Sequence, residues 1–374
     1  MDAVEELLDW ARSKGIEFNG LIPKRLPGRG VGVIATRPIK PDEVILEVPT
    51  SCLRSIDTVP TAVRSKLPKD ISVHGLLAAD LALDTSDKYS IWNAVCPRPE
   101  DFTSMPLLWP VPLQSLLPGP AKKLLSKQQV KLAKEWVAVN AAFPDLNRDR
   151  FTYGWLLANT RTFYYLNPSL KRRRKEDRMV LQPVADLFNH ADEGCNVNFD
   201  AQSFIVRAHK SYEMGEEIRI CYGRHGGDFL MVEYGFVMNP NQWDEVGLDE
   251  VVMPLLNDKQ REMLDDRGFL GSYVLDRNQV CYRTQVAMRT LCCNTREWAR
   301  FVDGMDDGDR SQRDVDQRLI EVLGKYRSSI SETLVNIREL HEGEQCQREL
   351  LVARWIHIDC LIENTVERLQ NEIA

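Results

Sequence analysis

The stretch VADLFNHADEGC, residues 184–195, places polar side chains in a segment that otherwise has the composition of a buried core. Asp186, Asn189 and His190 stand among valine, alanine, leucine and phenylalanine. About thirty residues later, the stretch IRICYGRHGGDFLMVEYGF, residues 218–236, places two tyrosines beside apolar runs. Buried polar side chains cost free energy unless they have partners. Such a cluster is therefore either satisfied internally or ready to bind a ligand.

Composition narrows the class of protein. The chain has 374 residues, more than the roughly 250 to 300 at which a single core stops growing, so two domains are expected. The net charge of −7 argues against a nucleic-acid partner, because phosphate binding needs a basic surface.

The nine cysteines form no CxxC spacing, which predicts reduced thiols and no metal site. No signal-peptide or membrane-spanning run is found, so we expect a protein of the cytoplasm or nucleus.

The N-terminal part predicts one helix followed by strands. In residues 2–15 the apolar residues follow the spacing of an amphipathic helix that ends near Gly15. Two β-branched runs, residues 31–36 and 44–48, are separated by a Pro-Asp-Glu turn signal. They predict a β-hairpin or two close strands.

A helical segment interrupts the β pattern. Residues from about 72 to 158 show helical periodicity, broken by a proline-rich connector over residues 97–120. Short strand patterns return in residues 179–189, 196–209 and 216–223. We therefore predict a β region that is split by a helical insert over about residues 72–160.

The C-terminal part is again helical, and its two longest periodic segments are residues 315–340 and 349–369. The predicted fold class is α+β, with a first domain over residues 1–243 and a helical domain over residues 244–374. The one charge run, KRRRKEDR at residues 171–178, falls in a predicted loop. A solvated loop and a patch for nuclear localisation or an acidic partner both remain open.

Four motifs occur in a defined order: GRGVGV, NTRTFYY, ADLFNH and CYG with EYGF, at residues 28–33, 159–165, 185–190, 221–223 and 233–236. In this order, and across a helical insert, they resemble the SET-domain protein methyltransferases. The likeness is greater to the class of the Rubisco large-subunit lysine methyltransferase and the actin histidine methyltransferase. In that class a helical substrate-binding domain follows the split SET domain, so the likeness covers nearly the whole chain.

The resemblance implies small, mostly antiparallel sheets with a pseudoknot, in which the FNH and CYG segments lie side by side at the bottom of one cleft. It also implies an enzyme whose cofactor is S-adenosylmethionine. The expected function is protein-lysine N-methylation of a non-histone protein, whose lysine side chain enters the cleft.

Several cofactor-binding residues follow from the resemblance. Gly30, Val31 and Gly32 would let the methionine part of the cofactor approach the backbone closely, which glycine permits. A tight turn between strands is the structural alternative. Arg161 would contact the cofactor carboxylate through a charge-assisted hydrogen bond. A surface or helix-capping arginine is the alternative for that position.

Asn189 and His190 would contact the adenine and amino groups of the cofactor, largely through backbone atoms. A satisfied core histidine is the alternative for His190. Tyr222 is the predicted catalytic residue and also a cofactor contact, because its hydroxyl could accept weak C–H···O contacts and orient the nucleophile. A tyrosine that only packs at a strand end is the alternative.

Aromatic residues near these motifs predict a substrate channel. Phe163, Tyr165, Tyr234 and Phe236 would line a narrow passage for an alkyl-ammonium side chain, which aromatic faces attract. Asp186 could hold the substrate backbone or a basic flank, and it could equally cap a turn.

Departures from family patterns refine the expected substrate. The actin histidine methyltransferase has an asparagine two residues after its cofactor arginine, whereas this chain has Phe163 there, which favours lysine. The cysteine cluster that binds zinc in histone-directed enzymes is absent after Tyr222. Protein-histidine methylation and a SET-scaffold adaptor with little activity are the alternatives, although the joint presence of Arg161, Asn189, His190 and Tyr222 disfavours the adaptor. A monomer is expected.

Overall fold

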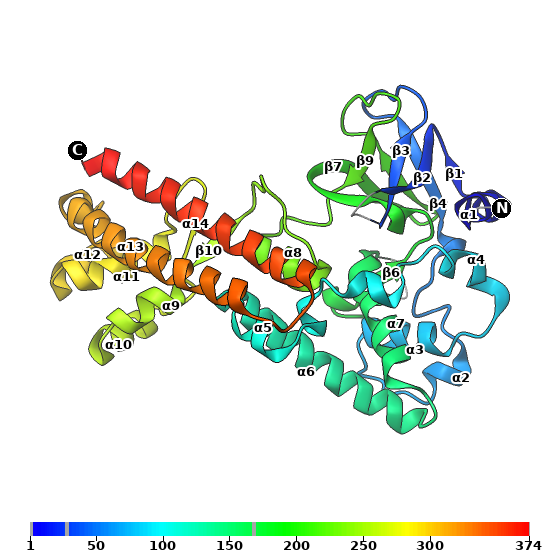
Figure 1. Cartoon of the computed structure of the whole chain (residues 1–374), viewed down its shortest axis with the longest axis horizontal. Coiled ribbons are helices and arrows are strands. Elements are labelled where there is room, and N and C mark those ends of the chain that lie inside the picture. Colours follow the sequence, from blue (N-terminus) through cyan, green and yellow to red (C-terminus); the bar gives the residue numbers. More distant parts are fainter. Residues whose placement is uncertain (1–2, 27–29, 167–169, 374) are drawn as a thin grey trace. The chain divides into compact units, whose positions relative to one another are not determined.

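The computed structural model describes residues 3–26, 30–166 and 170–373 (Figure 1). Contacts divide the chain into two compact units. The sheet unit comprises Met1–Phe102 and Lys127–Arg224, and the helical unit comprises Thr103–Ser126 and His225–Ala374. Each unit therefore draws on two separate stretches of sequence.

The described residues of the sheet unit form nine strands together with several helices. Its strands are β1 (Glu17–Phe18), β2 (Leu21–Leu26), β3 (Gly30–Ala35), β4 (Val44–Pro49), β5 (Thr162–Tyr164), β6 (Met179–Leu181), β7 (Asn189–Phe199), β8 (Ser203–Arg207) and β9 (Glu217–Ile220). Its helices are α1 (Ala3–Ser13), α2 (Thr61–Arg64), α3 (Val73–Leu83), α4 (Ser90–Asn93), the larger part of α6 (Gly119–Ala142) and α7 (Arg148–Arg161). A short 3-10 helix, η6 (Ala185–Leu187), precedes β7.

The helical unit contains one small sheet and eight complete helices among its described residues. The strands are β10 (Glu245–Gly247) and β11 (Val274–Asp276). The helices are α5 (Val111–Ser115), α8 (Gly227–Tyr234), α9 (Asp249–Val252), α10 (Asp258–Asp266), α11 (Tyr282–Cys292), α12 (Thr295–Val302), α13 (Asp309–Glu339) and α14 (Gln345–Ile373).

The main sheet has the strand order β1-β4-β8-β7-β9-β3-β2. Each neighbouring pair is antiparallel except β7–β9, which is parallel. The two β-branched runs near the N-terminus are indeed strands, β3 and β4, but the predicted hairpin between them is wrong. Strand β3 pairs with β2 and β9, whereas β4 pairs with β1 and β8. Strand β2 escaped prediction because Pro23, Lys24 and Arg25 obscure its apolar alternation.

Strands β7 and β9 come together at a crossing of two distant segments. His190 and Cys195 both pair with Ile220, so the chain between them bulges out of register. Gly194 makes this possible, because a Cβ atom there would lie 2.6 Å from the carbonyl carbon of Ile220 and 2.7 Å from the nitrogen of Cys221. A residue with a side chain would have to push backbone aside at this point.

The predicted helical insert is confirmed between β4 and β5. Helix α3 begins at Val73, where the hydroxyl of Ser72 accepts the N–H of Gly75 at 3.0 Å. The helix is buried on most sides, which is typical of a core helix. It packs closely against α7, since a Cβ atom at Gly154 would lie 2.7 Å from the carbonyl oxygen of Ala78.

In the helical unit a buried arginine joins α14 to α8 and β10. The Nε and Nη1 atoms of Arg354 bind Asp228 at 2.8 Å and Asp244 at 2.7 Å, and Nη2 donates to the carbonyl oxygen of Glu245 at 3.1 Å. The two longest predicted helices are confirmed as α13 and α14. The small β10–β11 sheet was not predicted, because strands of three residues show no periodicity. A domain boundary between residues 243 and 244 stays a prediction.

Replacing Gly194 by alanine should lower the free energy of unfolding by about 1–3 kcal/mol, because the added methyl group meets backbone atoms that cannot move cheaply. Gly324→Ala is the matched control, since Gly324 lies in α13 with no atom within 4 Å of an added Cβ. That change should raise stability by up to about 1 kcal/mol through helix propensity. Thermal midpoints of the two variants measure the contrast. Equal midpoints would mean that the crossing does not require glycine.

Candidate active site

Tyr222 follows β9 and is held at both ends by the segment that contains the Asn-His motif. Its backbone N–H donates to Nδ1 of His190 at 3.0 Å, and its hydroxyl donates to the carbonyl oxygen of Phe188 at 2.6 Å. The ring centroids of His190 and Tyr222 lie 5.0 Å apart. Because Nδ1 accepts a hydrogen bond, the neutral ring of His190 carries its proton on Nε2. The prediction that the two motifs lie side by side is confirmed.

The surroundings of Tyr222 keep its phenol protonated. Burial raises the pKa of Tyr222 to about 12, with the positive charge of Arg161 opposing and the charges of Asp186 and Glu217 assisting this rise. The hydroxyl proton is engaged by Phe188. A phenol oxygen that donates its proton in this way still has the chemistry of a hydrogen-bond acceptor.

Arg161 ends helix α7 and reaches the carbonyl oxygen of Asp186, to which its Nη1 atom donates a hydrogen bond. The same nitrogen lies 3.8 Å from Oδ2 of Asp186, and that oxygen also accepts the indole N–H of Trp92 at 3.0 Å. The side chain of Arg161 is 21% exposed and can still reach a ligand, whereas that of Asp186 is 2% exposed. This placement favours a role for Asp186 in holding Arg161. A direct substrate contact by Asp186 stays a prediction.

A strained turn leads into η6. Val184 has φ 68° and ψ −46°, and the N–H of Ala185 bonds to the carbonyl oxygen of Pro183 at 2.8 Å. This is the rarer form of the γ-turn, in which the central residue has a positive φ. A β-branched residue such as valine adopts that conformation only at a cost in free energy. The sequence contains no signal for it. Strain of this kind often persists next to functional sites, where the surrounding packing maintains it.

The glycine motif and Asn189 meet at strand β3. The side-chain nitrogen of Asn189, Nδ2, donates to the carboxylate of Glu217 at 2.8 Å. A Cβ atom at Gly32 would lie 2.8 Å from the same Nδ2 atom. Val31 is half-buried. Gly30 has φ +69°, and among residues 3–26, 30–166 and 170–373 no atom lies within 4 Å of an added Cβ, so these residues would let a ligand approach its backbone closely. Residues 28 and 29 of the same motif lie outside the described residues.

Two of the predicted substrate residues lie in or after strand β5. Phe163 pairs with Val180 of β6 and is half-buried. Tyr165 is 4% exposed, and its ring packs against Phe199 at 5.3 Å and Phe204 at 5.1 Å between centroids. These contacts give Tyr165 a place in the core of the sheet unit. Its role in a substrate channel stays a prediction.

The other two predicted substrate residues, Tyr234 and Phe236, belong to the helical unit. Their ring centroids are 6.2 Å apart, and Tyr234 lies 6.4 Å from His225 and 6.3 Å from Phe229. His225 stacks on Phe229 at 4.1 Å. The four rings form an aromatic cluster at the ends of α8. Their participation in the channel stays a prediction.

Sequence reasoning missed two side chains that support the site. Glu217 binds the amide of Asn189 and also receives two hydrogen bonds from Arg219, at 2.9 and 2.6 Å. Trp92 comes from the helical insert and lies 94 residues before its partner Asp186. Glu217 could have been suspected from its place in the strand before CYG. No local pattern could have revealed Trp92.

Within residues 3–26, 30–166 and 170–373, no group of three or more His, Cys, Asp or Glu side chains could hold a metal ion. No described helix is long and apolar enough to cross a membrane. All nine cysteines are free thiols.

Comparison with known proteins agrees with the geometry. The profile of the SET domain matches residues 30–223, a range that holds Gly30, Arg161, the Asn-His motif and Tyr222. The chain belongs to the SET-domain family. The profile of the ribosomal lysine N-methyltransferase 2 C-terminal domain matches residues 244–368.

Individual relatives and a solved structure match this SET-domain chain over most of its length. Ribosomal lysine N-methyltransferase set11 of Schizosaccharomyces pombe is 26% identical over 97% of this chain and 98% of its own. SET domain-containing protein 4 of Mus musculus is 28% identical over 79% of this chain and 74% of its own. The crystal structure of the SET domain of LSMT bound to lysine and AdoHcy matches with a TM-score of 0.67 and 16% identity, over 100% of this chain and 92% of that one. The α+β fold class is thereby confirmed.

Replacing Trp92 by phenylalanine should destabilise the protein by about 1–3 kcal/mol near pH 8, because a buried carboxylate loses a donor while the ring stays packed. Burial raises the pKa of Asp186, whereas Arg161 and Trp92 lower it. The indole therefore stabilises the charged form, and its contribution should fade as the pH falls through the pKa of folded Asp186. Thermal midpoints of the variant and the parent, measured in steps from about pH 8 down to about pH 4, test this. A loss that stays constant over the whole series would contradict the role of the carboxylate.

Proposed function

We propose that this protein is an S-adenosylmethionine-dependent protein-lysine N-methyltransferase that acts on a non-histone protein. The observation that carries the proposal is the placement of Tyr222, whose proton is engaged by Phe188 and whose backbone is bound to His190. The C-terminal match to a ribosomal lysine N-methyltransferase and the likeness to set11 support the reaction class. They also make a ribosomal protein the first substrate to test.

The cofactor site is proposed at the glycine motif and Arg161. The residues present there fit S-adenosylmethionine, because Gly30 has no side chain and a positive φ, no described residue crowds the position of its missing Cβ, and Arg161 remains partly exposed. Arg161 would hold the carboxylate of the cofactor. Gly30, Val31 and Gly32 would lie along its methionine part, and Asn189 and His190 near its adenine and amino groups. When bound, S-adenosylmethionine supplies a methyl group on a positively charged sulfonium.

Tyr222 would act by orientation and by charge placement. Its hydroxyl is oriented by donating to the carbonyl oxygen of Phe188, and in that orientation the oxygen would accept weak contacts from the methyl group or from the amine of the substrate. A pKa near 12 makes it unsuited to remove a proton at neutral pH. The substrate lysine, with an ordinary pKa of about 10.4, must therefore lose its proton to solvent before transfer.

Lysine is proposed as the acceptor because Phe163 stands two residues after Arg161. Phe163 of the sheet unit would offer an aromatic face to the alkyl-ammonium chain. For Tyr165, Tyr234 and Phe236 a contact with the substrate stays the prediction that the family resemblance gives. Asp186 would hold Arg161 in place, and a direct contact of Asp186 with the substrate backbone or a basic flank stays a prediction.

The helical region over residues 244–374 is proposed to bind the protein substrate. In the helical unit a cavity of about 370 Å³ lies between the α9 region and helix α13. Its lining combines apolar side chains with charged side chains of both signs, which suits the binding of a polypeptide segment. It is lined by Glu250, Val251, Pro254, Leu255, Arg318, Glu321, Val322, Lys325, Tyr326 and Ser329. Action in the cytoplasm or nucleus, as a monomer, completes the proposal.

Calorimetry should detect one S-adenosylmethionine site per chain. Arg161→Lys should weaken it by about tenfold or more, because lysine keeps the charge but loses the planar pair of donors. Arg148→Lys is the matched control, since Arg148 is an exposed residue at the start of the same helix. The control should bind as the parent does. No binding by the parent at millimolar cofactor would refute the proposed function.

Tyr222→Phe should reduce the single-turnover rate by about 100- to 1000-fold while cofactor affinity and thermal midpoint stay nearly unchanged. The assay uses labelled cofactor and ribosomal proteins, and mass spectrometry identifies the modified residue. Tyr164→Phe, a change at an exposed tyrosine, is the control and should keep the parent rate.

The pH dependence of the single-turnover rate distinguishes a Tyr222 that orients the substrate from a Tyr222 that accepts its proton. The rate should rise with pH in the parent and in Tyr222→Phe alike, because the substrate lysine supplies the titration. If the rise vanished in the variant, Tyr222 would be a proton acceptor and the proposed role would be wrong. Label on histidine in place of lysine would refute the assigned acceptor.

A further inference from the structure

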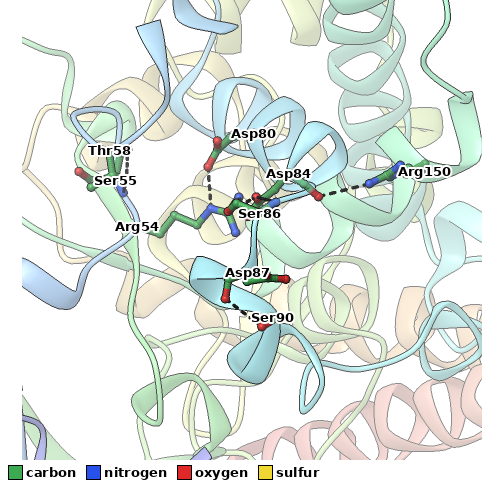
Figure 2. Close-up of polar contacts among 9 residues, drawn as sticks. All are labelled: Arg54, Ser55, Thr58, Asp80, Asp84, Ser86, Asp87, Ser90 and Arg150. Atoms are coloured by element: carbon green, nitrogen blue, oxygen red, sulfur yellow. Dashed lines mark hydrogen bonds and ion pairs between the residues drawn. The ribbon is translucent and has the colours of Figure 1, made fainter. Parts of the chain in front are cut away.

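Arg54 follows the short 3-10 helix Thr50–Cys52 that comes after β4, and its side chain is buried beside acidic residues of the helical insert. Its Nε atom binds Oδ2 of Asp80 at 2.6 Å and its Nη2 atom binds Oδ2 of Asp84 at 3.0 Å (Figure 2). The guanidinium also lies 4.6 Å from the ring centroid of Tyr89, and the side chain is 1% exposed. Through these ion pairs, Arg54 links the segment that follows β4 to helix α3 of the insert.

The remaining nitrogen of this guanidinium, Nη1, is buried and has no hydrogen-bond partner among the described residues. The same holds, within the described part of the chain, for Nε of Arg161 and Oδ1 of Asp186. Buried polar atoms in native proteins almost always have a partner, either in the protein or in an ordered water molecule. Three such atoms in one region point to a bound molecule that satisfies them.

The three residues line one small cavity. Arg54, Arg161 and Asp186 share its wall with Trp92 and Cys96, and its volume is about 10 Å³. A cavity of this size holds about one water molecule and nothing larger. Its wall also includes Leu81, Leu157 and Leu181, but the three unpartnered polar atoms of the arginines and Asp186 supply the two to four partners that a buried water needs.

We propose that one ordered water molecule occupies this cavity and joins Arg54 to Arg161 and Asp186. The two arginine N–H groups would donate to its oxygen, and one of its hydrogens would go to Oδ1 of Asp186. Three hydrogen bonds are typical of a buried water. A chloride ion could accept from both arginines but would be repelled by the carboxylate of Asp186.

The water makes Arg54 a positioning residue for the site. Asp186 already holds Arg161 through its backbone carbonyl and Trp92 through Oδ2. The bound water would orient the other carboxylate oxygen and Nε of Arg161, and Arg54 would hold that water from the side of helix α3. The orientation of Arg161 would thus depend on an ion pair in the helical insert. The link to cofactor affinity rests on the proposed function, whereas the water itself does not.

A crystal structure of the full chain tests the water directly. The expected result is one water peak within about 3.2 Å of Nη1 of Arg54, Nε of Arg161 and Oδ1 of Asp186. An empty cavity, or direct contact between Arg54 and Asp186 in place of the water, would overturn the proposal. This arm is independent of catalysis, so it remains decisive even if the protein fails to bind S-adenosylmethionine.

A variant tests the positioning role. Arg54→Lys keeps a positive charge beside Asp80 but removes the donor that faces the cavity, so calorimetry should show S-adenosylmethionine bound about 5- to 10-fold more weakly. Arg150→Met is the matched control, because Arg150 is exposed and donates to the carbonyl oxygen of Asp84 at 3.4 Å (Figure 2). The control should bind with the parent affinity.

Thermal midpoints separate positioning from a purely structural effect. A weaker cofactor affinity in Arg54→Lys at a midpoint close to that of the parent supports the proposal. A lowered midpoint with unchanged affinity would reduce Arg54 to a structural residue and overturn its positioning role. Should Arg54→Lys fail to fold, the water position in the parent crystal decides the proposal by itself.

Discussion

The parallel pairing of β7 with β9 is the constraint on which the rest of the sheet unit depends. It brings His190 beside Ile220, and the N–H of Tyr222 then reaches Nδ1 of His190. Gly194 permits the close crossing that this pairing demands. Since the hydroxyl of Tyr222 returns to Phe188, the same few contacts close the sheet and orient the phenol. Fold and candidate site therefore share one set of hydrogen bonds.

Two buried arginines show how differently a charge can be accommodated. In the helical unit, Arg354 directs its three nitrogens to Asp228, Asp244 and the carbonyl oxygen of Glu245. In the sheet unit, Arg54 binds Asp80 and Asp84 but leaves one nitrogen facing a cavity. A buried ion pair adds little net stability over apolar packing. A complete network such as that of Arg354 serves to join elements, whereas an incomplete one beside Arg161 suits a site that must hold a ligand-binding group in place.

Much of the architecture could be predicted from local patterns. The amphipathic spacing near the N-terminus is helix α1, the insert contains α3, α6 and α7, and the tail ends in α13 and α14. The errors concern pairing and short elements. β3 and β4 lie apart in the sheet, with β8, β7 and β9 between them, and β10 and β11 are too short for a periodic signal. Alternation reveals that a segment is a strand, but not which strand it pairs with.

The sequence by itself determined the family, because four motifs in a fixed order across a helical insert are specific together, and the SET-domain profile over residues 30–223 agrees. It also identified the residues that meet at the crossing: Asn189, His190 and Tyr222. Only the tertiary structure decided that Asp186 is buried beneath Trp92 and that Tyr165 packs in the core. The physical reason is that such contacts join residues many positions apart. A hydrogen bond or a packed ring between distant segments leaves no periodicity in either of them, so it exists only once the chain has folded.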